Sequence, residues 1–278
     1  MTISGGIKFF DLNLADSKTG ATATASSGDP SADFILDRNQ YTVWRSVGSD
    51  DTTTETVEIT LDAPETFSRL FLLRHNFKEF IVEYDDSGWT DFSNVIGING
   101  VTSSVISETD YAADSAYYEF DTVTTDKIRI SATKTQVADE EKFLNSFAVC
   151  EELGTLEGFP IIKNATKDKK LRKSTLLNGR SFVTKSLEVM RFSLDFKNYP
   201  ASLLNDLDLL FSLFDRDDNF LVWLCGGKNG EPYFKYQLRG FRIEDLIEMQ
   251  VVNIFKDSYR KNYYNGVVRM KLSLEEAG

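Results

Sequence analysis

Alternation of apolar and polar residues in the first half of the chain constrains the fold more than any other feature. Val57, Ile59 and Leu61 alternate with Glu58 and Thr60. The same period recurs further along the chain, in residues 80–84, 128–132 and 147–149. A period of two buries one face of a strand and exposes the other. Since no helical pattern separates these runs, we predict a mainly β fold, with a jelly-roll-like β-sandwich over residues 1–153.

Charge divides the 278 residues into two parts. Residues 1–152 hold 11 lysines and arginines against 27 aspartates and glutamates, a net charge of −16. Residues 153–278 hold 20 against 16, a net charge of +4, so the whole chain carries −12. The step predicts two units with different surroundings. Because phosphates repel an acidic surface, nucleic acid is not expected as a partner of the first unit.

The second part has a different pattern. Residues 154–175 are expected to form a linker or arm, and residues 176–278 a smaller α+β domain. Its helix is predicted over residues 203–214, where apolar residues fall on one stripe after Pro200. Strands are expected at 190–196, 220–224, 233–238, 251–255 and 267–274. The glycine-rich stretch 226–230 fits a hairpin turn and lacks the spacing of a phosphate loop.

A basic cluster lies in the expected arm. We regard four of its residues as candidates for assembly contacts: Lys169, Lys170, Arg172 and Lys173. The alternatives are a solvated arm and contact with nucleic acid.

The two cysteines and the hydropathy of the chain give few indications of function. Cys150 and Cys225 are expected to be free, buried thiols, one in each unit. The N-terminal residues lack a basic run and an apolar segment, so we expect no signal peptide. No apolar run reaches the length of a membrane span. We therefore expect synthesis in a cytoplasm, without a membrane partner.

An apolar pair, Asp37, a short polar loop and Thr42-Val43-Trp44 follow one another in residues 35–46. This order resembles the front loop and next strand of discoidin-type domains, the coagulation factor 5/8 type C family. Further segments follow in the family's order, at residues 20–27, 55–61, 67–76, 80–89 and 127–130. The resemblance covers residues 5–153 and implies a galactose-binding-like sandwich that binds ligands and rarely catalyses. Trp44 matches a buried family position and is expected in the core.

The resemblance implies a calcium site near the front loop. Asp37, Asn39 and Thr42 are the candidate ligands, since calcium favours six to eight hard oxygens. Arg38 stands where the family usually has glycine, and its charge could replace the cation. The alternative is a loop tied by hydrogen bonds between side chains and backbone. No other cofactor is expected.

The resemblance also implies a ligand site at one end of the sandwich. Relatives bind sugars or lipids through loops there, and the candidate sugar contacts are Tyr41, Arg45 and His75. Aromatic faces stack on sugars, and arginine or histidine can hydrogen-bond hydroxyls. Such modules also serve as protein-docking domains.

The second part resembles structural domains from the tails and baseplates of tailed bacteriophages. The resemblance covers residues 160–278 and depends on the order of five features: the turn 177–180, the predicted helix after Pro200, the segment 220–227, the segment 239–242 and a final strand ending in Leu-Ser-Leu-Glu-Glu. It implies a virion protein that assembles with copies of itself and with other tail proteins.

Catalytic signatures are sparse. His75 is the only histidine, so neither a histidine-rich zinc site nor a Ser-His-Asp triad is predicted. We expect a non-enzymatic structural protein of a phage tail, in a tail tip, baseplate or collar, that displays a discoidin-like module. Its opposite charges would steer neighbouring copies together. The alternative is a carbohydrate-binding adhesin or receptor-binding module that contacts a host surface glycan. An enzyme appended to a sugar-binding module is a more distant third.

Overall fold

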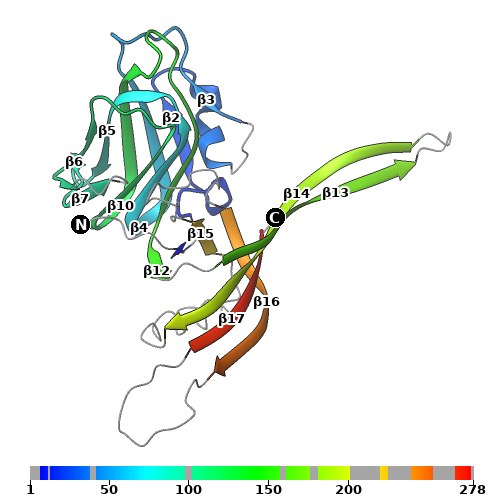
Figure 1. Cartoon of the computed structure of the whole chain (residues 1–278). Helices are drawn as coiled ribbons and strands as arrows, with labels where there is room; N and C mark the ends of the chain where they lie inside the picture. Colours follow the sequence, from blue (N-terminus) through cyan, green and yellow to red (C-terminus); the bar gives the residue numbers. More distant parts are fainter. Residues whose placement is uncertain are drawn as a thin grey trace, which may run out of the picture. The chain divides into compact units, whose positions relative to one another are not determined.

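Figure 1 shows the computed structural model of the chain, which describes residues 7–11, 13–37, 42–97, 102–156, 161–175, 181–200, 220–224, 239–252 and 267–276. These residues divide into two compact units, one within residues 12–152 and one formed by residues 5–11 with 153–278. The second boundary coincides with the charge step. Within the described ranges, no helix is both long and apolar enough to cross a membrane.

The first unit is an antiparallel β-sandwich, which confirms the predicted fold class. Its strands are β2 (Thr22–Ala25), β3 (Trp44–Arg45), β4 (Glu55–His75), β5 (Phe77–Asp85), β6 (Trp89–Asp91), β7 (Val95–Gly97), β8 (Thr102–Ser103), β9 (Ile106–Glu108), β10 (Ser115–Thr135) and β11 (Phe143–Cys150). Two 3-10 helices accompany them, η1 (Ser17–Thr19) and η2 (Asp29–Leu36).

Two long strands, β4 and β10, run through both layers of the sandwich. The first part of β4 pairs with β2 and with the last part of β10, which in turn pairs with β5. The last part of β4 pairs with β11 and with the first part of β10, which continues to β7. Between these parts, residues 62–66 of β4 are all exposed, and β10 carries register shifts. The two strands predicted at 55–61 and 67–76 are therefore one continuous strand that passes from one layer to the other.

The core lies between the layers and follows the predicted alternation. Ile59 and Ile130 enter it from the first layer, and Leu72 and Phe147 enter it from the second; each is at most 1 % exposed. Trp44 is fully buried, as predicted. Burial of such side chains contributes about 1.5–3 kcal/mol each. The core therefore explains why the alternating segments fold as a sandwich.

The 3-10 helix η2 leads into the front loop, and the sequence pattern did not predict it. Asp29 and Asp33 of η2 accept hydrogen bonds from the backbone N–H groups of Ala25 and Ala23, and so satisfy donors of strand β2. Gly28 precedes η2 with a φ of 63°, and a Cβ there would lie 2.0 Å from the backbone oxygen of Arg45. Only glycine permits this approach between η2 and β3.

The second unit is a seven-stranded sheet in the order β12-β1-β15-β16-β17-β14-β13. Its strands are β1 (Ile7–Phe10), β12 (Glu152–Leu156), β13 (Ile161–Thr175), β14 (Ser181–Pro200), β15 (Phe220–Leu224), β16 (Arg239–Val252) and β17 (Val267–Glu276). The predicted strands at 220–224 and 267–274 correspond to β15 and β17.

Several expectations for the second unit differ from the structure. The expected linker 154–175 contains β12 and β13, because pairing with β14 supplies the order that the strand's own polar sequence does not indicate. Strand β14 continues through Pro200 rather than ending before it. Residues 7–10, assigned to the sandwich, pair instead with β15. The predicted helix 203–214 and the strand 233–238 lie outside the described residues.

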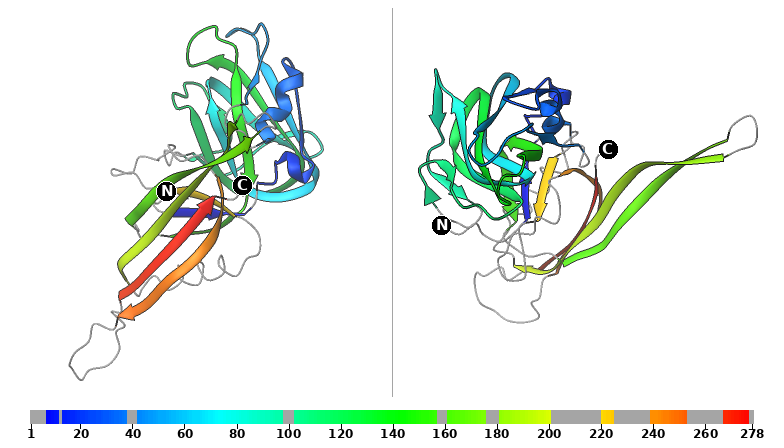
Figure 2. Two further views of the ribbon diagram at one scale, coloured as in Figure 1. Left: turned by 90° about the vertical axis from the view of Figure 1, so that its right-hand side faces the viewer. Right: turned by 90° about the horizontal axis from the view of Figure 1, so that it is seen from above.

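Strands β13 and β14 form a hairpin that extends beyond β17, the strand that pairs with β14. β14 pairs with β17 only from Arg191 to Pro200. Beyond that point nine register pairs, from Lys167↔Met190 to Thr175↔Ser181, join β13 to β14. No other described strand pairs with this part of the hairpin. Figure 2 shows this part of the hairpin running past β16 and β17. We call residues 167–175 and 181–190 the distal ribbon.

Candidate functional site

An arginine on an aromatic ring marks one end of the sandwich. Arg45 is exposed on β3, and its guanidinium carbon lies 5.1 Å from the ring centroid of Phe143 on the neighbouring strand β11. This distance is within the range of a cation–π contact. Arg45 has no carboxylate within ion-pair distance among the described residues, whereas Arg69 and Arg129 pair with Glu152 and Glu83.

Asn76 fixes the ring that supports Arg45. Its side-chain oxygen accepts a hydrogen bond from the backbone N–H of Phe143 at 2.9 Å, and its amide donates to the backbone oxygen of Glu141 at 2.9 Å. Phe143 is half-buried, so part of its surface remains accessible. We call Arg45, Phe143 and the adjoining corner at Asn76 the rim. It offers guanidinium donors beside an apolar ring, which suits a polar ligand with some apolar faces.

The backbone at the end of β4 gives the rim its shape. Arg74 has a φ of 55°, an uncommon value for a residue with a side chain, and its side chain is exposed. Arg74 is the one exposed residue between Leu70 and Phe77, and its neighbours Leu73 and His75 are both buried. The backbone N–H of Arg74 donates to the hydroxyl of Ser115 at 3.1 Å, which supports the turn.

The structure does not place His75 on the surface, where its predicted sugar contact would need it. The side chain is 1 % exposed and packs against Phe77, Phe80 and Tyr111. Its Nδ1 accepts a hydrogen bond from the backbone N–H of Phe77 at 3.1 Å, while Nε2 is buried and has no hydrogen-bond partner among the described residues. Burial lowers the pKa of His75 from 6.5 to about 3. We therefore treat it as a neutral core residue; its burial among Phe77, Phe80 and Tyr111 is not visible in the sequence.

The predicted calcium ligands are brought together only in part. The hydroxyl of Thr42 lies 3.0 and 2.9 Å from the two carboxylate oxygens of Asp37, and the backbone oxygen of Thr42 accepts a hydrogen bond from the Asn145 amide. In the part of the chain that the structure describes, no group of three or more histidine, cysteine, aspartate or glutamate residues could hold a metal. The contacts of Thr42 are those that the alternative of a hydrogen-bonded loop implies, and the calcium site stays a prediction.

The remaining predicted residues lie elsewhere. Tyr41 and Asn39 are outside the described residues. The four assembly candidates all fall on β13, where Lys169, Lys170, Arg172 and Lys173 stand opposite Glu188, Leu187, Thr184 and Val183 of β14. Cys150 is buried, as predicted, and Cys225 lies outside the described residues.

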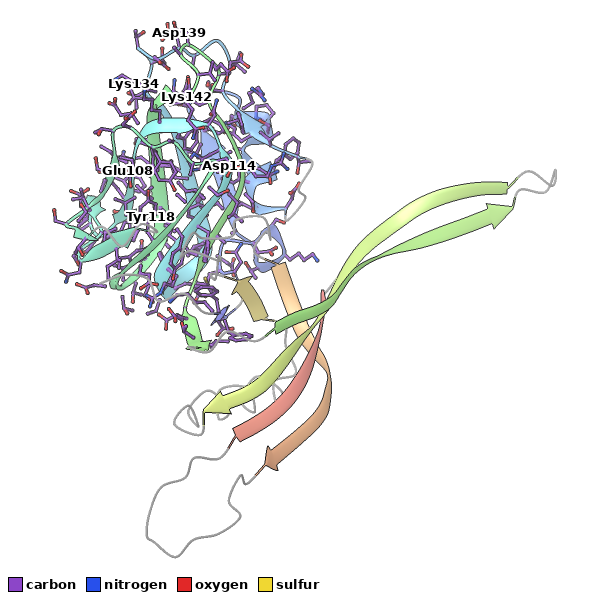
Figure 3. All side chains as sticks on the ribbon, viewed as in Figure 1. Glu108, Asp114, Tyr118, Lys134, Asp139 and Lys142 are labelled. Atoms are coloured by element: carbon purple, nitrogen blue, oxygen red, sulfur yellow. The ribbon has the colours of Figure 1, made fainter. Side chains whose placement is uncertain are left out.

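The sequence pattern did not indicate a role for Lys142, the residue that precedes Phe143 of the rim. Lys142 is fully buried, and its Nζ donates to the backbone oxygen of Asp50 at 2.6 Å. Burial lowers its pKa, although the carboxylates of Glu55, Asp51 and Asp50 act in the opposite direction. Figure 3 places Lys142 near Asp139 and Lys134 at this end. Lys142 therefore ties the loop at Asp50 to the start of β11, a role that only the fold reveals.

The described side chains at the rim include groups that can bind a polar ligand. The single histidine is buried and neutral, so it cannot serve as a surface base at ordinary pH. The rim supplies hydrogen-bond donors and an aromatic surface.

Comparisons with known proteins concern the fold of the first unit. No protein-family model and no curated protein matches the chain. Solved structures that resemble its N-terminal half include a chitosan-binding module from a chitosanase/glucanase of Paenibacillus sp. IK-5, with 20 % identity and a TM-score of 0.39 over 50 % of this chain and 98 % of that module.

Two other similar structures come from Clostridium perfringens. The family 32 carbohydrate-binding module of NanJ, in complex with galactose, has 18 % identity and a TM-score of 0.38 over 52 % of this chain and 99 % of the module. A further module, in complex with GalNAc-β-1,3-galactose, has 13 % identity and a TM-score of 0.38 over 50 % of this chain and 99 % of the module. Such low identities do not transfer a ligand to this chain.

Proposed function

We propose that the sandwich is a non-enzymatic glycan-binding module and that its rim holds the sugar. The observation that carries this proposal is the exposed Arg45 guanidinium seated on Phe143 without a carboxylate partner among the described residues. A guanidinium presents five N–H donors in a fixed plane, which suits vicinal hydroxyls. An aromatic ring beside it suits the apolar face of a sugar. Tyr41 and the exposed Arg74 would extend the contact, and His75 would support it from within.

The test is glycan binding by the full chain on an array of host and cell-wall glycans, followed by calorimetry on the strongest ligand. We expect Arg45→Ala to weaken binding about 10- to 100-fold, since hydrogen bonds to charged groups contribute about 1.5–3 kcal/mol. Lys127→Ala, an exposed change on β10, is the matched control and should leave binding unchanged. A chain that binds no glycan, or equal affinity of the Arg45 variant, would contradict the proposal.

A second candidate function is a structural protein of a phage tail, in which the C-terminal unit assembles and the sandwich is displayed. The distal ribbon favours it, because an isolated two-stranded ribbon is only marginally stable in water and gains from a partner. On this proposal the chain would be made in the host cytoplasm and incorporated into the virion. Its partners would be copies of itself and other tail proteins.

Light scattering of the purified chain, with negative-stain images of the same fraction, tests this second function. Closed rings or tubes are expected, and their mass gives the copy number. A stable monomer that also fails to join purified tails would count heavily against it, and would leave glycan binding as the sole proposed function.

A further inference from the structure

The distal ribbon is the part of the described chain with the least support from its neighbours. Each central strand of a sheet is stabilised by hydrogen bonds on both sides, whereas residues 181–190 of β14 have only β13 beside them among the described strands. Strand β13 is the edge of the sheet throughout. Both outer edges of the distal ribbon therefore carry backbone donors and acceptors for which the described strands offer no pairing.

The composition of the distal ribbon restricts what can lie against it. Its 19 residues include six cations, five of them on β13, and only two anions, Asp168 and Glu188. Two such edges would repel each other, so strand-to-strand pairing of two β13 edges is disfavoured. The same charge favours an acidic partner.

The chain itself contains such a partner. Residues 12–152 form a separate compact unit, and the part of the chain up to residue 152 carries a net charge of −16. Exposed carboxylates occur at its loop end, at Asp50, Asp139 and Glu140, and on other loops such as Asp86. Opposite charge over areas of this kind steers association and fixes its register.

From these observations we infer that the distal ribbon docks on the acidic sandwich of a second copy of this chain. The inference rests on the assembly role proposed above and adds the element that makes the contact and the surface that receives it. It makes assembly sensitive to ionic strength, because exposed charges are screened within about 8 Å at physiological salt.

The test mixes 15N-labelled and unlabelled full-length protein and joins amines to carboxylates with a zero-length carbodiimide. Mass spectrometry should find crosslinks between opposite isotope labels that join distal-ribbon lysines to sandwich carboxylates. The double variant K169E/K170E should reduce these crosslinks at least tenfold and lower the mass in light scattering. The double variant K18E/K127E is the matched control, because it makes the same charge change at exposed sandwich positions.

Several outcomes would overturn the inference. Ribbon crosslinks confined to one isotope label would place the contact within a single copy, and mixed-label crosslinks between two ribbons would show edge pairing. Duplex DNA that protects the ribbon lysines, without mixed-label crosslinks, would identify nucleic acid as the partner. If K169E/K170E assembles like the parent, the assembly role stands, but the contact between the distal ribbon and the sandwich is excluded. If the parent chain is monomeric and joins no tails, the assembly role itself fails.

Discussion

The β4–β10 pair and the β13–β14 pair are both long and antiparallel, yet they are supported in opposite ways. In the sandwich, β10 has β4 on one side and β5 or β7 on the other, and β4 has β2 or β11 on its second side. In the second unit, the distal ribbon has no third strand among the described ones. Length alone therefore does not make a strand pair stable; neighbours on both edges and a buried face do.

This difference separates two roles. Strand β11 is enclosed by β3 and β4 and can hold Phe143 in a fixed position beside Arg45 of the edge strand β3, which a binding site requires. A strand pair with open edges is suited to completing its hydrogen bonds and contacts with another molecule. The sandwich is thus the rigid part on which a ligand site can be built, and the distal ribbon is the part that gains from association.

Proline substitution should give the largest difference in stability between the β4–β10 pair and the β13–β14 pair. Ile130 lies in β10 opposite Val57 and Val82 and is 1 % exposed, so Ile130→Pro removes a ladder hydrogen bond and a core side chain. We expect a loss of more than about 3 kcal/mol, enough to unfold the sandwich. Val183→Pro, whose described neighbour is Lys173 of β13 alone, should leave the sandwich folded.

Hydrogen exchange measured peptide by peptide distinguishes the two variants. Peptides from β4 and β10 should lose protection in Ile130→Pro and keep it in Val183→Pro. Equal loss in both variants would show that the distal ribbon supports the sandwich, and the contrast between the two strand pairs would fail.

The sequence predicts strands that have one apolar and one polar face. It does not predict strands whose order comes from pairing with another strand. Alternation identified both parts of β4 and the end of β10, because one face is apolar and the other polar. It could not show that residues 62–66 continue the strand, since all five are exposed and they include a proline. The basic residues of β13 were assigned to an arm for the same reason: their strand order comes from pairing with β14.

The candidate site was predictable in composition and less so in geometry. Arg45 and the burial of Trp44 follow from the motif in residues 35–46, and the structure places Arg45 on the surface. The burial of His75 depends on packing that includes Tyr111 from a distant segment, and the role of Lys142 depends on a loop 92 residues away in sequence. Contacts of this kind between distant segments leave no local pattern.

Acid should destabilise the sandwich through His75, the only histidine in the chain. Its pKa falls from 6.5 to about 3 on folding, so between these values the unfolded chain binds more protons than the folded one. The free energy of unfolding should therefore fall as pH drops below 6.5, by about 2 kcal/mol at pH 5. Denaturant unfolding followed at pH 7, 6 and 5 measures this slope.

A His75→Asn variant is the control, because its side-chain oxygen can replace Nδ1 as acceptor for Phe77 while it does not titrate. The variant will be less stable at pH 7, but its slope between pH 5 and 6.5 should be flatter. An equally steep slope would show that another group is responsible.

The smallest expected effect concerns the front loop and tests whether hydrogen bonds suffice there. Thr42→Val keeps the shape of the side chain and removes the hydroxyl that contacts both oxygens of Asp37. We expect a loss of about 1–2 kcal/mol in the free energy of unfolding, near the lower end for a hydrogen bond to a charged group, because the pair is only part-buried. If hydrogen bonds hold the loop, calcium and a chelator should give the same melting temperature for the parent chain. A melting temperature that rises with calcium, and does so less in Thr42→Val, would instead restore the calcium site, since a ligand that binds only the folded state stabilises it.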